Sequence, residues 1–293
     1  LSLHDALPIC KNTPKYINVN GTLIDLSSPK VMGILNLTPD SFYDVSRTQS
    51  EESIRTRVRQ ILQEGGAMID VGAYSSRPNA DFISVTEEMD RLRRGLKVIF
   101  DEAPNAVVSV DTFRADVAKM CVEEYGVAII NDIAAGGMDK NMFQTVAHLN
   151  VPYIMMHMKG TPQTMQKDIH YDNFIKEVFE YFAVRVGELH ELGVKDIILD
   201  PGFGFAKTVA HNYQLLHAMG EFELFELPLL VGVSRKSMIY KFLGLTPAES
   251  LNGTTVLNTL SLERGANILR VHDVKEAVET VKLVEKMKSE AQF

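Results

Sequence analysis

The sequence places polar side chains directly after a series of short apolar runs, and these side chains have the types that catalytic and binding sites use. In chain order they are Asn36, 75–78, Asp111 and Thr112, Asn131 and Asp132, His157, 200–202, 234–237 and 270–272. Solvation at the end of an apolar run explains a single polar residue equally well. The whole series favours one shared functional site.

Basic residues gather after the last two apolar runs. The stretch LPLLVGVSRKSM, residues 227–238, ends in the adjacent cations Arg235 and Lys236, and NILRVHDV carries Arg270 and His272. A net charge of −8 argues against nucleic-acid binding, because such binding requires extended neutralisation of phosphates. The cations are therefore expected to act locally, on an anionic small molecule that the planar arginine fork can hold.

Two segments that carry aspartates indicate the chemical class of the ligand more closely. LDPGFGFAKT follows Asp200 with a glycine-rich turn that carries Phe203 and Phe205, which predicts close backbone approach and ring stacking on a flat heterocycle. Asp70 interrupts the apolar run MIDVGA, and an unpaired buried carboxylate is costly. We therefore expect Asp70 to have a hydrogen-bond donor as a partner.

The apolar runs are predicted to be strands, because they are rich in β-branched residues and bounded by turn residues. The expected strands are Val31–Leu37, Met68–Ala73, Val107–Val110, Ala128–Ile133, Pro152–Met156, Asp196–Leu199, Leu229–Val233 and Asn267–Val271. Each is followed by a stretch with helical spacing, such as 51–66. Near-continuous apolar strands are typical of parallel sheets covered by helices.

Eight such strand–helix units predict the α/β class and a (β/α)8 TIM barrel, as a single domain over 31–293 with residues 1–30 as an N-terminal extension and lead-in. A doubly wound sheet is the alternative, but NLTPDS after the first strand is not its glycine-rich turn. TIM barrels carry catalytic groups at the carboxyl ends of strands and often bind phosphate at the last two. The polar series falls at those ends.

Other features of the sequence bear on the cellular compartment of the protein. Cys10 and Cys121 lack CxxC spacing, so free thiols in a reducing cytoplasm are expected. No run approaches the roughly 18 apolar residues of a membrane span. Residues 1–10 lack an initiator methionine and the features of a signal peptide, and we expect them to be artefactual.

Several segments resemble, in the right order, the signatures of the dihydropteroate synthase family of folate biosynthesis. They are VMGILNLTPDSF, MIDVGAYSSRPNA, VVSVDTFRADVA, AIINDIAAG, YIMMHMKGTPQTMQ, IILDPGFGFAKT, LLVGVSRKSM and NILRVHDV. The resemblance covers the chain from Val31 onward. It implies a transferase that condenses 6-hydroxymethyl-7,8-dihydropterin diphosphate with p-aminobenzoate, giving 7,8-dihydropteroate and pyrophosphate.

The same resemblance implies roles for individual residues. Pterin binding would fall to Asp111, Asn131, Met156, Asp200 and Lys236. p-Aminobenzoate binding would fall to Phe42, Ser76, Arg77, Pro78, Phe205, Arg235 and Ser237. The diphosphate would be held by Asn36, Arg270 and His272, with Asn36 acting through a Mg²⁺ ion. The catalytic residues would be Asp44, Lys236, Arg270 and His272.

The segment TPDSFYDVSR, residues 38–47, resembles the mobile lid of the family and carries Asp40 besides Phe42 and Asp44. The chain departs from the family in having Ser76 where threonine is usual and DVSR where a glycine pair is common. The family further implies a homodimer through the last helices, a cytoplasmic location and sulfonamides as inhibitors. No nucleic acid or membrane partner is expected.

Three other functions stay open at this point. A methyltetrahydrofolate:corrinoid methyltransferase shares the pterin-binding barrel, but nothing in it calls for SRKS or RVH. An aldolase-type barrel would use Lys236 as a Schiff base, which borohydride trapping would reveal. A non-catalytic barrel that binds a partner protein is the third, and the complete series of polar strand ends argues against it.

Overall fold

Eight parallel strands form one sheet in a computed structural model that describes residues 15–37, 47–74, 83–162, 164–165 and 169–291. Their order in the sheet is β8-β7-β6-β5-β4-β3-β10-β9. Their bounds are β3 Lys30–Asn36, β4 Met68–Gly72, β5 Val108–Asp111, β6 Ile129–Asp132, β7 Tyr153–Met156, β8 Ile197–Asp200, β9 Leu230–Val231 and β10 Ile268–Val271. Every expected strand is present, with its ends within two residues of the expected ones.

The sheet closes on itself between β8 and β9. Leu199 of β8 forms a parallel bridge with Leu229, and its amide donates to the Pro228 carbonyl at 2.9 Å. Closure of eight parallel strands with helices outside is the TIM barrel architecture. The predicted single-domain barrel is confirmed, and the doubly wound alternative is wrong.

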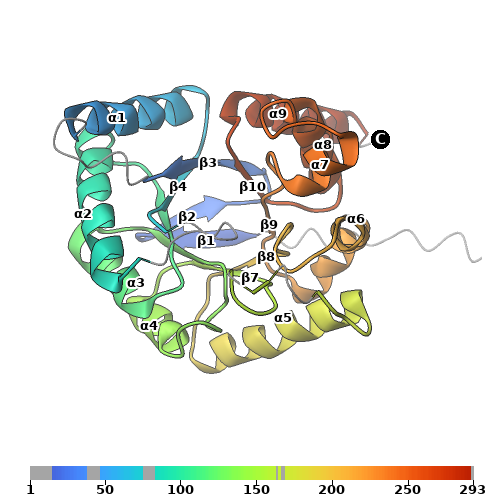
Figure 1. The fold of residues 1–293 in the computed structure, drawn as a ribbon, viewed down its shortest axis with the longest axis horizontal. Coiled ribbons are helices and arrows are strands. Elements are labelled where there is room, and N and C mark those ends of the chain that lie inside the picture. Colours follow the sequence, from blue (N-terminus) through green and yellow to red (C-terminus); the bar gives the residue numbers. More distant parts are fainter. Residues whose placement is uncertain (1–14, 38–46, 75–82, 163, 166–168, 292–293) are drawn as a thin grey trace, which may run out of the picture.

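Helices surround the barrel on its outside, as Figure 1 shows. Their bounds are α1 Arg47–Gln63, α2 Val85–Glu102, α3 Ala115–Tyr125, α4 Met142–Leu149, α5 Phe174–Glu191, α6 Val209–His217, α7 Ser237–Leu243, α8 Leu251–Glu263 and α9 Val274–Glu290, with the 3-10 helix η2 Ala218–Phe225. Within the described ranges, no helix combines the length and apolarity that crossing a bilayer would take.

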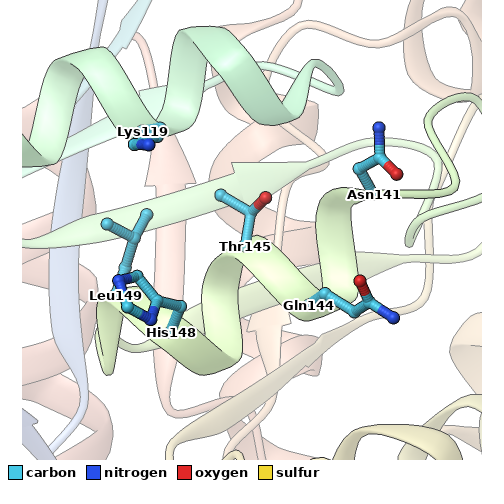
Figure 2. A pocket seen from close by; sticks show the side chains of 6 residues that line it. All are labelled: Lys119, Asn141, Gln144, Thr145, His148 and Leu149. Carbon is cyan, nitrogen blue, oxygen red and sulfur yellow. The ribbon is translucent and has the colours of Figure 1, made fainter.

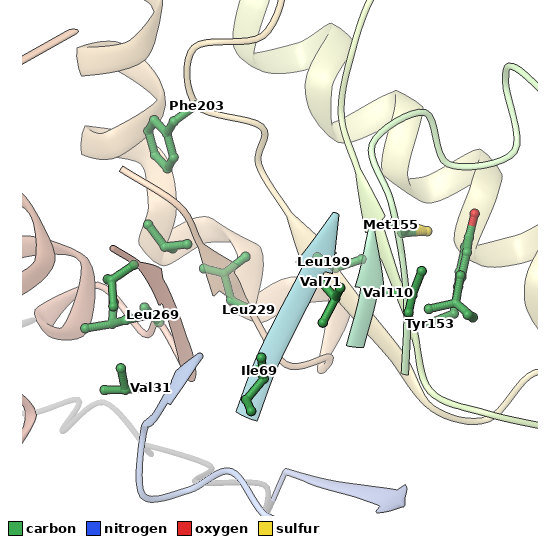
Figure 3. Close-up of a cluster of buried hydrophobic side chains, with 14 of the residues drawn as sticks. Val31, Ile69, Val71, Val110, Tyr153, Met155, Leu199, Phe203, Leu229 and Leu269 are labelled. Atoms are coloured by element: carbon green, nitrogen blue, oxygen red, sulfur yellow. The ribbon is translucent and has the colours of Figure 1, made fainter. Parts of the chain in front are cut away.

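The main hydrophobic core lies between the strands and these helices. Its strand residues include Ile69 and Val71 of β4, Val110 of β5 and Leu199 of β8, all fully buried and labelled in Figure 3. Because the barrel interior buries the other face as well, the strands read as continuous apolar runs rather than alternating ones.

An antiparallel hairpin, absent from the sequence-based expectation, precedes the barrel. It consists of β1 Tyr16–Val19 and β2 Thr22–Asp25. Asn20 and Gly21 connect the strands with φ of 49° and 84°, the left-handed pair of a type I′ turn. An Asn-Gly pair between alternating residues is a known hairpin signal, so the sequence does contain the information.

The hairpin covers the amino end of the barrel. Ile17 and Leu26 are fully buried. They pack on a layer from the beginnings of the strands, namely Met32, Met68, Ala128, Ile129, Ile154, Ile198, Leu230 and Ile268. The described part of the lead-in is therefore part of the barrel structure, and it covers the end opposite to the polar series.

Candidate active site

The site residues predicted on strands gather at one end of the barrel. They are Asn36 of β3, Asp111 of β5, Asn131 of β6, Met156 of β7, Asp200 of β8 and Arg270 of β10. Each is the last or next-to-last residue of its strand. Because parallel strands share one direction, these side chains meet at the carboxyl end of the barrel.

Arg270 lies between two carboxylates. Its Nε donates to Oδ2 of Asp70 at 2.6 Å, and its Nη2 donates to Oδ2 of Asp111 at 3.1 Å. Asp70 is fully buried, so the expectation that it has a donor partner is confirmed. Burial raises the pKa of Asp111 to about 7, while Arg270 opposes this shift. The guanidinium is held in one orientation, and Nη1 is the nitrogen that these two contacts leave for another acceptor.

Asp70 also orients the amide of Asn131. Nδ2 of Asn131 lies 3.3 Å from Oδ1 and 3.2 Å from Oδ2 of Asp70. Because an ionised carboxylate can only accept, the NH₂ group of the amide must face Asp70. Oδ1 of Asn131 consequently faces away from Asp70 and can accept a hydrogen bond from a ligand.

Lys236 precedes α7 and lies close to the loop after β8. Its Nζ donates to the Phe203 carbonyl and is 4.8 Å from the centroid of the Phe205 ring. Burial lowers the pKa of Lys236 to about 8, and the nearby Asp200 partly counteracts this. Lys236 is therefore a donor whose charge is sensitive to pH near neutrality.

Asp200 is buried at the end of β8. Its Oδ1 accepts from the Gly202 amide at 2.8 Å, which fixes the plane of the carboxylate. Burial raises the pKa of Asp200, and Lys236 lowers it. The described residues donate no side-chain hydrogen bond to Oδ2, so this oxygen can accept from a ligand.

Two glycines lie between the polar groups. A Cβ on Gly72 would be 3.7 Å from both Asn36 Oδ1 and Asp111 Cβ. A Cβ on Gly232 would be 3.8 Å from Arg270 Cβ and 3.9 Å from Lys236 Nζ. Side chains longer than a methyl group at these positions would enter the space between the functional groups.

His272 follows β10 and is oriented by Ser234. The Ser234 hydroxyl lies 3.0 Å from Nδ1 of His272, and its oxygen accepts from the His272 amide at 3.1 Å. Partial burial and the neighbouring Arg270 lower the pKa of His272. If the hydroxyl donates to Nδ1, the neutral ring carries its proton on Nε2, which is then a donor.

Arg235 is engaged elsewhere. Its Nε and Nη2 donate to the Asp273 carboxylate at 2.8 and 2.7 Å, and its Nη1 donates to the carbonyls of Pro247 and Ala248 at 3.0 and 2.7 Å. These contacts fasten the loop between α7 and α8, which is a structural role. Binding of p-aminobenzoate by Arg235, and by Ser237 at the start of α7, stays a prediction.

The remaining predicted residues lie outside the described part of the chain. They are Phe42 and Asp44, together with Asp40 of the same segment, and Ser76, Arg77 and Pro78. Their proposed roles are predictions from the resemblance alone.

Phe203 does not have the stacking role that the sequence suggests. Its ring is fully buried in the main hydrophobic core, and Figure 3 shows it there. Phe205, two residues on, is partly buried beside Met156 in a small cluster at the strand ends. Of the two rings, Phe205 is the one that can face a ligand.

Lys207 is a structural residue that sequence reasoning missed. Its Nζ is buried and lies 2.9 Å from His157 Nδ1, 2.9 Å from the Gly202 carbonyl and 3.0 Å from the Phe205 carbonyl. It therefore ties the loop after β8 to the end of β7. The signal was a lysine inside the otherwise apolar stretch PGFGFAK, and His157 is its partner.

A surface pocket lies elsewhere on the molecule. Figure 2 shows it between the outer helices α3 and α4. Its lining residues are Lys119, Asn141, Gln144, Thr145, His148 and Leu149. None of them belongs to the strand-end group, so we place the candidate site at the carboxyl end of the barrel.

Comparison with known sequences shows the family to which the chain belongs. The profile described as pterin binding enzyme matches residues 32–272. The dihydropteroate synthase of Escherichia coli (strain K12) is 41% identical over 267 residues, which are 90% of this chain and 94% of the relative. That of Haemophilus influenzae is 38% identical over 266 residues, which are 90% of this chain and 96% of the relative.

Solved structures give the same result. The Yersinia pestis dihydropteroate synthase in complex with a sulfonamide drug has a TM-score of 0.84 at 37% identity, over 94% of this chain and 99% of that one. The Xanthomonas albilineans enzyme with 4-aminobenzoic acid has a TM-score of 0.85 at 31% identity, with the same coverage. The chain thus belongs to the pterin binding enzyme family, as a member of the dihydropteroate synthases.

Proposed function

We propose that the protein condenses 6-hydroxymethyl-7,8-dihydropterin diphosphate with p-aminobenzoate to give 7,8-dihydropteroate and pyrophosphate. As a dihydropteroate synthase, it is a transferase of folate biosynthesis. The observation that carries the proposal is the meeting of oriented acceptors with a lysine donor at the strand ends. The methyltransferase, aldolase and partner-binding alternatives have no comparable support.

The oriented acceptors suit a pterin ring. Asp200 Oδ2 and Asn131 Oδ1 can each accept a hydrogen bond from a ligand, and Asp111 provides a second carboxylate. A pterin presents N–H donors along a guanidine-like edge and a carbonyl that Lys236 can reach. A site of this kind rejects rings that lack the donors, because its own buried acceptors would be left unpaired.

The basic side chains suit the leaving group. In the reaction, the bond between the pterin methylene carbon and oxygen breaks, and pyrophosphate leaves with the electron pair. Arg270 Nη1 and His272 Nε2 are the donors we assign to the diphosphate oxygens. Fixed donors aimed at developing charge contribute on the order of a few kcal/mol each. The p-aminobenzoate nitrogen then forms the new C–N bond and loses a proton.

We assign a Mg²⁺ ion to the side chain of Asn36, beside these groups. Asn36 is exposed at the end of β3, and its Oδ1 and the Cβ of Asp111 would each lie 3.7 Å from a Cβ built on Gly72. Oxygen donors in small number suit Mg²⁺, which completes its coordination shell with phosphate oxygens and water. When bound, the ion would neutralise charge on the leaving diphosphate.

The p-aminobenzoate side of the site is assigned to Phe205, Ser237 and Arg235 among the described residues. Phe205 supports this assignment best, since its ring is only partly buried and lies next to Lys236. Ser76, Arg77, Pro78 and Phe42 would complete the pocket, and Asp44 would act from the segment that follows β3.

We also propose a cytoplasmic homodimer. Exposed apolar side chains on α7, α8 and α9, which neighbour one another in Figure 1, support the dimer. They are Phe242, Leu243, Val256, Leu283 and Met287. The buried free thiol of Cys121 is compatible with a reducing compartment. Light scattering on the purified protein would test the dimer, and a monomer at micromolar concentration would contradict it.

The test of the reaction is pyrophosphate release from the pterin diphosphate, with and without p-aminobenzoate and Mg²⁺. We expect pyrophosphate and dihydropteroate in equal amounts only when all components are present. An Arg270→Ala variant should lose turnover, whereas Arg59→Gln, on the outer face of α1, should keep it. If the intact enzyme released no pyrophosphate when all components are present, the proposed function would be contradicted.

A further inference from the structure

Arg57 of α1 contacts the backbone of two neighbouring strands at the site. Its Nη2 donates to the His272 carbonyl at 2.6 Å, and its Nε donates to the Ile34 carbonyl of β3 at 3.2 Å. Its Nη1 donates to Gln60 Oε1 at 2.9 Å. One guanidinium therefore joins the ends of β3 and β10, where Asn36 and His272 are located.

The bridge begins where the strand ladder ends. The last residues paired between β10 and β3 are Val271 and Gly33. Beyond that pair, the two strands exchange no further backbone hydrogen bonds, and carbonyls at such positions need other donors. The Arg57 side chain donates to the carbonyls of both Ile34 and His272, so it links β3 and β10 beyond the last backbone pair.

Close packing of α1 on β3 makes this reach possible. A Cβ on Gly33 would lie 2.7 Å from Cγ1 of Ile61, which is closer than atoms can pack. Glycine at this position therefore lets Ile61 rest directly on the strand. Arg57 lies one helical turn before Ile61 on the same face, toward the carboxyl end of β3.

Arg57 also brings positive charge to the site. All three of its hydrogen-bonded nitrogens contact carbonyl or amide oxygens rather than a carboxylate. Its charge contributes to lowering the pKa of His272, after the larger effects of burial and Arg270. The guanidinium thus favours anions near the ends of β3 and β10.

We propose that Arg57 is a positioning residue for the diphosphate group of the pterin substrate. By joining the ends of β3 and β10, it fixes the separation between Asn36 and His272, the two groups that would hold the diphosphate from these neighbouring strands. This inference rests on the proposed function and adds a residue outside the strand-end series to it. The pterin ring contacts on β5, β6 and β8 should not depend on Arg57.

The test compares Arg57→Gln with the intact enzyme in steady-state kinetics and calorimetry. The KM for the pterin diphosphate and the Kd for Mg²⁺-pyrophosphate should rise by about tenfold or more, as expected for the loss of hydrogen bonds from a charged donor. The KM for p-aminobenzoate and the Kd for the pterin alcohol without diphosphate should stay unchanged. Thermal melting checks that the variant is folded.

Two further variants separate the explanations. Arg59→Gln removes the same charge from α1, but Arg59 faces Glu102 and Glu52, so pyrophosphate affinity should be unchanged. Arg57→Lys keeps the charge but cannot donate to both carbonyls in the same geometry, so it should not restore the intact KM.

The outcomes are distinct. Unchanged pyrophosphate affinity in Arg57→Gln, or full restoration by Arg57→Lys, would overturn the positioning role while the intact enzyme still turned over its substrates. Intact enzyme without turnover would overturn the proposed function and the inference with it. A uniform loss of affinity for pterin alcohol, p-aminobenzoate and pyrophosphate would show a general structural role and also overturn the inference.

Discussion

The carboxylate of Asp70, fully buried in the barrel, accepts from Nε of Arg270 at 2.6 Å. The two residues lie on β4 and β10, on either side of β3 in the sheet. This ion pair orients the arginine that we assign to the diphosphate, and Asp70 itself need not touch substrate. Asp70 thereby links the stability of the barrel to the geometry of the site.

Breaking this pair should destabilise the protein. Asp70→Ala removes the fully buried one of the two carboxylates that pair with Arg270 and leaves only Asp111, and we expect the free energy of unfolding to fall by about 3–5 kcal/mol. Urea denaturation measures it. The double variant Asp70→Leu with Arg270→Met should recover much of the stability and no activity. A loss below about 1 kcal/mol in Asp70→Ala would contradict the importance of the pair.

Asp200→Asn should weaken pterin binding. The amide can keep its oxygen on the Gly202 amide, but it then presents NH₂ where the ring needs an acceptor. We expect the affinity for the pterin substrate to fall by about 10- to 100-fold, corresponding to about 1–3 kcal/mol. Calorimetry measures this, with Asp196→Asn as the control because Asp196 lies at the opposite end of the barrel, beside β1. Equal affinity in Asp200→Asn and intact protein would refute the pterin assignment.

Activity should depend on pH in a bell-shaped manner. Burial raises the pKa of Asp111 to about 7, so activity should fall as pH decreases below this value and the carboxylate is protonated. Burial lowers the pKa of Lys236 to about 8, so activity should fall as pH increases above this value and the ammonium loses its proton. Profiles of kcat/KM against pH report both groups in the free enzyme.

Lys236→Arg identifies the alkaline limb. A guanidinium keeps its charge throughout this range, so the residual activity of the variant should no longer fall near pH 8. The acidic limb should stay in place because Asp111 is unchanged. An alkaline limb that persists at the same pH in the variant would mean that another group causes it.

The hairpin before the barrel should contribute to stability. Ile17 is fully buried against the amino end of the strands, so Ile17→Ala should lower the free energy of unfolding by about 2–5 kcal/mol. Leu23, on the partner strand of the hairpin, is 67% exposed, and Leu23→Ala should change it by less than about 0.5 kcal/mol. Equal effects of the two substitutions would show that the hairpin does not pack as described.

The sequence by itself determined the eight strands of the barrel, their positions and the class of fold, but not the preceding hairpin. Each strand is an apolar run with turn residues on both sides, and these signals are local, so they survive without tertiary information. The polar residues after the strands and their order along the chain were also sufficient for the family. Parallel packing then guarantees that residues such as Asp111, Asp200 and Arg270 meet at one end.

The tertiary structure decided which polar groups face one another. Arg235 and Arg270 are both found at the ends of apolar runs. Arg235 nevertheless pairs with Asp273 outside the strand-end group, whereas Arg270 pairs with Asp70 inside it. Side-chain direction and partner depend on contacts between segments far apart in sequence, which no local pattern encodes. For the same reason, no local pattern points to Arg57. It can donate to the carbonyls of Ile34 and His272 only once β3 and β10 lie side by side and α1 packs on Gly33.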